Sequence, residues 1–117
     1  MYTSLYFYRV PKNNTEAFLN IQKKSAEIYV KYGAIDDWTF KAGDLKAIYG
    51  CVSFLQNIPM SADEELFFSL SLFKSKDEHD KIISLVDKDP EIEKLYGQIY
   101  SLIDLSKVIR GEFNRVV

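Results

Sequence analysis

The sequence has little of the residue types that build metal centres, disulfide frameworks and phosphate loops. Its 117 residues include one cysteine, Cys51, one histidine, His79, and five scattered glycines. A single cysteine cannot close an internal disulfide, and the apolar neighbours of Cys51 predict a small buried side chain. The chain has no CxxC or HExxH motif and no glycine-rich phosphate loop, which argues against zinc and nucleotide enzymes. We therefore expect no metal and no cofactor.

Long hydrophobic runs and an excess of positive charge are also missing. No apolar stretch approaches the roughly 20 residues that cross a membrane, and no basic leader precedes an apolar segment at the N-terminus. Fifteen basic residues against seventeen acidic ones leave a net charge of -2, so no global positive field attracts nucleic acid. These features favour a cytoplasmic protein that binds neither nucleic acid nor a membrane.

The chain does contain the residue balance of a globular protein. Apolar residues make up 47% of the sequence and charged residues make up 27%. A chain of this length buries about two-thirds of its unfolded surface around one core. We therefore predict a single domain over residues 1–117.

Hydrophobic periodicity predicts the secondary structure. Alternating β-branched and aromatic residues predict strands over 2–10, 35–41, 66–73 and 107–117. Apolar residues at helical spacing predict a first helix that begins with a cap at Asn13 and ends at Gly33. Later helices are predicted to begin at the capping box Ser75–Glu78 and at Asp89–Pro90. The pattern leaves the course of residues 42–63 open.

The order of these elements is β-α-β-β-α-β, which favours an α+β, ferredoxin-like fold with an antiparallel sheet and helices on one face. The strand over 66–73 has two rows of side chains, and its all-apolar row is predicted to pack against the helices. That row consists of Leu66, Phe68, Leu70 and Leu72. The reverse row would then expose Phe67 and Phe73 beside Tyr6 and Tyr8. A patch of this size requires a partner that covers it.

Short segments spread along the chain occur in an ordered series. The segments are Val10-Pro11, Tyr32-Gly33-Ala34-Ile35, Asp44, Glu65-Leu66-Phe67-Phe68-Ser69, Ser75-Lys76, Asp80, Asp89-Pro90, Ile109, Gly111 and Phe113. In this order and spacing, and nearly from end to end, the sequence resembles the YbaA-like family of uncharacterised bacterial proteins. The family pattern has Trp where Leu70 stands and Tyr where Arg110 stands, and it has a Pro-Phe-Asp-Gly turn in place of Leu102–Leu105.

The resemblance implies a dimeric α+β barrel, in which two ferredoxin-like protomers pack sheet against sheet. A second copy of the chain would then cover the aromatic face of the sheet. We therefore expect a homodimer through the sheet face. Because the family has no settled activity, the resemblance implies no particular reaction.

Aromatic residues on both sheet faces favour a small, partly apolar or aromatic ligand. Tyr6, Trp38 and Phe40 are predicted to line its pocket together with His79. His79 is the only candidate general base, because histidine exchanges protons near neutral pH. A helical histidine on an apolar stripe is, however, more often a packing residue.

Two other functions stay open. The first is a purely structural or protein-interaction dimer without a small-molecule site. The second is a cofactor-free oxygenase or isomerase that acts on an apolar molecule. RNA-recognition motifs share the same element order and stack bases on aromatic side chains, but Glu64 and Glu65 at the third strand oppose phosphate binding.

Overall fold

β-Branched and aromatic residues alternate in direction along four strands, and these strands pair into one antiparallel sheet. The computed structural model describes residues 1–117. Its strands are β1 (Tyr2–Pro11), β2 (Asp36–Lys41), β3 (Glu64–Phe73) and β4 (Ile109–Asn114). They lie in the spatial order β2-β3-β1-β4, and each neighbouring pair is antiparallel. The α+β, ferredoxin-like fold is therefore confirmed.

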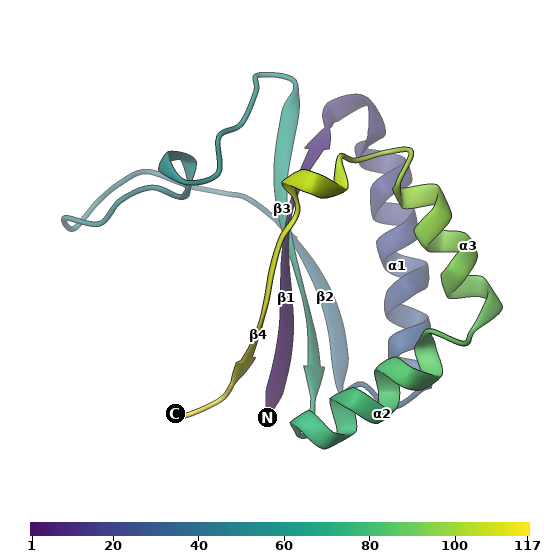
Figure 1. Cartoon of the computed structure of the whole chain (residues 1–117). Helices are drawn as coiled ribbons and strands as arrows, with labels where there is room; N and C mark the ends of the chain where they lie inside the picture. Colours follow the sequence, from purple (N-terminus) through teal and green to yellow (C-terminus); the bar gives the residue numbers. More distant parts are fainter.

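Three helices cover one side of the sheet (Figure 1). They are α1 (Thr15–Lys31), α2 (Lys76–Val86) and α3 (Pro90–Ile99). Single 3-10 turns lie over η1 (Lys12–Asn14), η2 (Phe54–Gln56) and η3 (Leu105–Lys107). None of the helices combines the length and the apolarity that crossing a membrane requires.

The predicted starts of the second and third helices are confirmed. Ser75 Oγ accepts a hydrogen bond from the backbone N–H of Glu78 at 3.1 Å. Asp89 Oδ1 accepts one from the N–H of Glu91 at 2.8 Å, with Pro90 at the first helical position. Each cap satisfies a backbone donor that the helix leaves free, and this sets where the helix begins.

Helix α1 begins differently from the prediction. The 3-10 turn occupies the position of the expected cap at Asn13, and Asn14 is the N-cap without a side-chain cap bond. The Asn14 side chain instead donates to the carbonyl of Leu102 at 2.9 Å, which ties the start of α1 to the segment after α3. The predicted end is confirmed at Gly33, whose φ of 117° favours glycine.

The helices cover the sheet face opposite to the one predicted. Phe67 and Phe73 are 2% and 0% exposed, and the Phe67 ring centroid lies 5.4 Å from that of Phe18 on α1. Tyr8 of β1 also contacts Phe18, at 5.1 Å between centroids. The prediction that the row Leu66–Leu72 packs against the helices was therefore wrong. The row that does so contains Ser69 and Ser71, and two serines in a strand usually indicate a face turned to solvent. We call the covered side the helix face and the other side the open face.

The hydrophobic core lies between the helix face and the three helices. Fourteen buried residues form one cluster, drawn from β1, β3 and all three helices and from the segments that follow α1 and α3. Four of its members have no exposed surface at all, namely Val10, Phe18, Phe73 and Val86. Burial of each such side chain contributes about 1.5–3 kcal/mol relative to exposure, so this layer supplies most of the packing.

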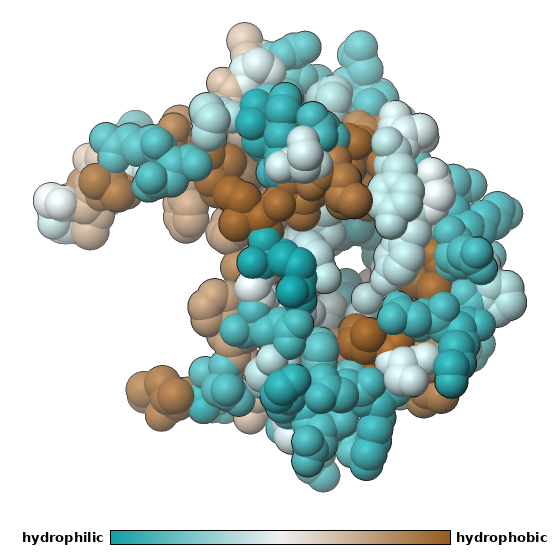
Figure 2. Space-filling view, in the orientation of Figure 1, coloured by the Kyte–Doolittle hydropathy of each residue, from teal (hydrophilic) through white to brown (hydrophobic).

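The open face is apolar and partly exposed. Trp38 and Phe40 of β2 are 44% and 43% exposed. The Phe40 ring stacks on Phe68 of β3 at 4.8 Å between centroids, and Phe68 in turn contacts Phe7 of β1. Figure 2 shows hydrophobic residues along this side of the molecule.

Residues 42–63, which we call the arm, extend from the open side of the sheet, away from the helices (Figure 1). The arm exposes Tyr49 and Val52, while Ile58 is buried. Phe54 of the arm packs on Phe7 at 5.4 Å between ring centroids. Cys51 is exposed, so its predicted burial was wrong: the arm carries it away from the core.

Candidate functional site

A cavity of about 260 Å³ lies between the helix face of the sheet and helices α1 and α3. It exists because β3 carries the small residues Ser69 and Ser71 in its middle. Phe67 and Phe73, on either side of these serines, fill the space toward the helices, whereas the serines leave it open. The space-filling view shows a hollow between the sheet and the helices (Figure 2).

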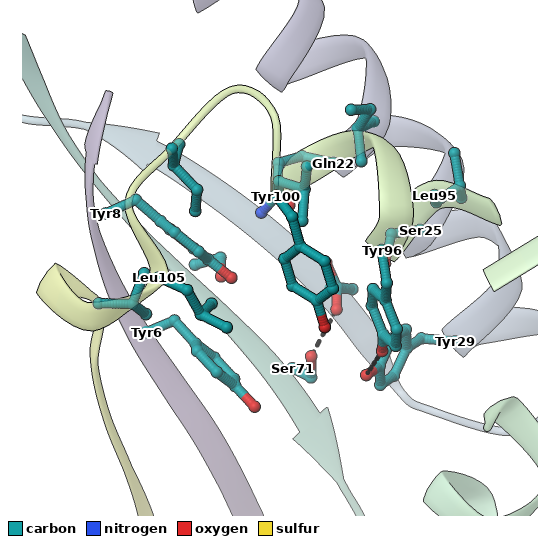
Figure 3. Close-up of a pocket in the computed structure, with 16 residues that line it drawn as sticks. Tyr6, Tyr8, Gln22, Ser25, Tyr29, Ser71, Leu95, Tyr96, Tyr100 and Leu105 are labelled. Carbon is teal, nitrogen blue, oxygen red and sulfur yellow. Dashed lines mark hydrogen bonds between the residues drawn. The ribbon is translucent and has the colours of Figure 1, made fainter. Parts of the chain in front are cut away.

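Tyrosines from the sheet and two helices surround this cavity. They are Tyr6 and Tyr8 of β1, Tyr29 of α1, and Tyr96 and Tyr100 at the end of α3. The hydroxyl groups gather in the same region of the close-up (Figure 3). The Tyr29 and Tyr96 hydroxyls form a hydrogen bond of 3.0 Å. The walls are thus apolar rings that carry polar tips.

Burial controls the protonation of these tyrosines. Loss of solvation raises the pKa of Tyr8, Tyr29 and Tyr96 above the ordinary value of a phenol. Their hydroxyls therefore stay protonated at neutral pH. Protonated phenols can donate hydrogen bonds to a ligand in the cavity.

Asp37 provides the one carboxyl group among the residues that line the cavity. Strand alternation turns it toward the helix face, opposite Ser71 on β3, while Asp36 points to the open face. Ser71 Oγ donates a hydrogen bond to Asp37 Oδ2. These two neighbouring carboxylates therefore point to opposite faces of the sheet, as strand alternation requires.

The pKa of Asp37 is raised from 3.8 to about 6. Burial is the main cause, because it penalises the charged carboxylate; the Ser71 hydrogen bond lowers the pKa, and the nearby charge of Asp36 raises it. Asp37 therefore changes protonation close to neutral pH. A carboxyl group of this kind in a cavity is suited to proton transfer.

The structure does not bring the four predicted ligand-binding residues together. Tyr6 lines the cavity. Trp38 and Phe40 lie on the open face, because β2 turns Asp37 and Thr39 toward the helices instead. The sheet therefore separates this pair from Tyr6.

His79 lies in the first turns of α2, outside the residues that line the cavity. It is 7% exposed and packs between two rings, with centroids 5.2 Å from Tyr2 and 4.7 Å from Phe73. Its Nδ1 lies 2.8 Å from Asp80 Oδ1, and its Nε2 lies 3.9 Å from Glu112 Oε1. This environment is that of a packed side chain with polar contacts at both ring nitrogens.

Neither composition nor a motif singled out Asp37 as a site residue. The available signal was positional: an acid on β2 shares a sheet face with two serines in the middle of β3. That coincidence becomes visible only when the strand register is known. No group of three or more His, Cys, Asp or Glu side chains is arranged to hold a metal ion.

Fold and cavity together define a ferredoxin-like α+β domain with a small-molecule-sized cavity between its sheet and helices. The chain belongs to the family described as Protein of unknown function (DUF1428), whose sequence model matches residues 1–100. No match was found among curated proteins. Membership in this family establishes no specific function.

Solved structures share the fold at low sequence identity. A candidate antibiotic biosynthesis monooxygenase from Nitrosomonas europaea has a TM-score of 0.67 at 9% identity, covering 100% of each chain. An uncharacterised NIPSNAP domain protein from Burkholderia xenovorans has a TM-score of 0.61 at 13% identity, covering 100% of this chain and 96% of that one. A dimeric ferredoxin-like protein from an uncultured marine organism has a TM-score of 0.61 at 16% identity, covering 99% and 94%. These similarities show the fold alone.

Proposed function

We propose that this protein binds a small, partly apolar molecule in the cavity between the sheet and helices α1 and α3. The observation that carries the proposal is a 260 Å³ space with apolar walls, five tyrosine hydroxyls and one carboxyl group. At protein packing density this volume holds roughly a dozen non-hydrogen atoms. The chemistry of the walls suits a ring system with one or two polar substituents.

We further propose a homodimer in which two open faces pack against each other. The exposed rings of Trp38 and Phe40, with Phe113 of β4, give this face more apolar surface than a monomer usually leaves in water. A dimeric ferredoxin-like protein is among the structures with the same fold. In this proposal Trp38 and Phe40 belong to the subunit interface, and Tyr6 remains a ligand contact.

The narrower YbaA-like grouping and a cytoplasmic location are also part of this proposal. The ordered segments around Glu65–Ser69 support the grouping. The free, exposed thiol of Cys51 suits a reducing compartment.

Native mass spectrometry of freshly purified protein tests the ligand site. We expect a bound metabolite that denaturation releases. The variant Ser25→Phe places a ring at a cavity-lining position of α1 and should abolish the bound mass. The matched control Lys24→Phe introduces the same ring at the neighbouring exposed position and should retain it.

The alternative is a purely structural dimer, which the apolar open face favours. It predicts a dimer that carries no bound molecule in the wild type or in either variant. Retention of the ligand by Ser25→Phe would place the ligand outside this cavity and overturn the proposed site.

A further inference from the structure

We propose that Asp37 is the proton-transfer group of an isomerase site, acting on a small β,γ-unsaturated carbonyl compound bound in the cavity. The inference rests on the proposed small-molecule site and adds a reaction to it. It follows from three features: a partly buried carboxyl group, hydroxyl donors on the other walls of the same cavity, and an apolar lining around them.

The carboxyl group is held in a defined position. Asp37 lies on β2, and β2 pairs with β3 along its whole length. Ser71 Oγ donates to Asp37 Oδ2, and Oδ1 accepts no hydrogen bond from the protein. A strand-borne base with one oxygen engaged loses little orientational freedom when it meets a substrate.

Hydroxyl donors line the other walls of the cavity that Asp37 lines. Tyr8 comes from β1, and the hydrogen-bonded pair Tyr29 and Tyr96 comes from α1 and α3 (Figure 3). A phenol that stays protonated can donate to the oxygen of an enolate as negative charge develops there. A carboxylate base combined with tyrosine donors in an apolar site is an established arrangement for enolisation.

The proposed reaction needs no oxidant and no cofactor. The Asp37 carboxylate removes a proton from the carbon between the carbonyl group and the C=C bond. The electron pair of that C–H bond forms a dienolate, whose oxygen accepts a hydrogen bond from a tyrosine. Protonated Asp37 then returns the proton to the far carbon of the original double bond, and the product is the conjugated ketone. Atoms and electrons balance within the substrate.

The groups around Asp37 set the expected pH dependence. Tyr8 of β1, Tyr29 of α1 and Tyr96 of α3 stay neutral near pH 7, and Asp36 of the same strand is the nearby charge. With a pKa of about 6 for Asp37, the rate should rise with pH through this value and then level off.

Isomerisation of 3-cyclohexenone to 2-cyclohexenone, followed by ultraviolet absorbance, tests the inference. Wild type should accelerate the reaction over buffer, and Asp37→Asn should reduce the rate roughly 100-fold or more. Ser71→Ala should move the rise of the pH profile to higher pH, because it removes the hydrogen bond that lowers the pKa of Asp37. Glu93→Gln, an equivalent change at an exposed position of α3, should leave the rate unchanged.

Binding of 2-naphthol, a planar phenol that cannot isomerise, separates the two proposals. If naphthol binds and Ser25→Phe abolishes this binding, while wild type shows no acceleration or Asp37→Asn keeps full activity, the isomerase inference is overturned and the ligand site stands. If the wild type retains no metabolite after purification and naphthol does not bind it, the ligand site and the inference both fail.

Discussion

A partly buried carboxyl group beside a cavity of serine and tyrosine side chains lowers the stability of a small domain at neutral pH. Asp37 has this position, and its only direct side-chain hydrogen bond comes from Ser71. A neutral isostere would avoid the cost of burying the charge. Residues that keep such a cost are found at sites where the charge has a use.

Replacement of Asp37 by Asn should therefore stabilise the protein in a pH-dependent way. The folded-state pKa of about 6 exceeds the ordinary value of 3.8, so the native state binds more protons than the unfolded state between these values. The stability contributed by Asp37 thus falls as pH rises from about 4 to about 6. We expect Asp37→Asn to gain up to about 3 kcal/mol at neutral pH and almost nothing near pH 4.

Urea denaturation of both proteins at the two pH values measures this difference. The comparison isolates Asp37, because acids with lowered pKa values affect wild type and variant alike. An example is Glu64, which accepts hydrogen bonds from the backbone of Ser61 and from Arg9. A difference in stability between wild type and variant that is the same at both pH values would contradict the expectation.

His79 illustrates how a residue with suitable chemistry can serve packing instead. Its ring is buried between Tyr2 and Phe73. We expect His79→Ala to lower the free energy of unfolding by about 1–3 kcal/mol through lost aromatic contacts, with naphthol binding unchanged. Calorimetric titration of the folded variant with 2-naphthol measures the binding. Loss of binding without loss of stability would indicate that His79 has a role in the ligand site.

At the scale of elements, β3 shows what a strand pattern leaves undecided. Both of its rows contain large apolar residues, so alternation alone indicates a strand without indicating which row meets the helices. Pairing with the neighbouring strand determines which row of β3 is buried. Tyr2 and Val10 of β1 lie on the helix face, and they pair with Phe73 and Glu65. The two serines of the buried row then form the floor of the cavity.

Two adjacent substitutions on β3 test this face assignment. Phe67→Ala should lower the free energy of unfolding by about 3–5 kcal/mol, because Phe67 is 2% exposed in the core. Phe68→Ala, on the open face, should leave the stability of the protomer closer to wild type and weaken self-association. Denaturation and light scattering on the same samples distinguish the two, and the reverse pattern would mean that the helices cover the other face.

At the scale of the whole molecule, the layers are unequal. Helices cover one side of the sheet, and on the other side the arm leaves the sheet largely uncovered (Figure 1). The arm carries the highly exposed Tyr49, and Phe54 of the arm packs on Phe7 of the open face. An exposed arm continuous with an apolar face is the shape expected of one half of a dimer.

A charge on the open face should therefore dissociate the protein. We expect light scattering to give the mass of a dimer for wild type at micromolar concentration and that of a monomer for Phe40→Lys, since burial of an unpaired ammonium group is costly. Val30→Lys, at an exposed position of α1 on the other side, should remain a dimer. A monomeric wild type would remove the basis for the dimer proposal.

Local chemistry in the sequence by itself determined the elements and their order. These signals act over a few residues, so they can be recognised without knowledge of the fold. They are strand alternation, the caps at Ser75 and Asp89, and the helix end at Gly33. The same holds for the opposite directions of Asp36 and Asp37, which alternation alone requires.

Only the tertiary structure decided which sheet face is buried, where residues 42–63 run, and which side chains share a cavity. Tyr6 and Asp37 meet the tyrosines of α1 and α3 across strand pairings and helix packing between residues distant in the sequence. Trp38, the neighbour of Asp37, is carried to the other face by the same pairing. The physical reason is that a site assembled from five elements depends on register and packing, which no local pattern encodes.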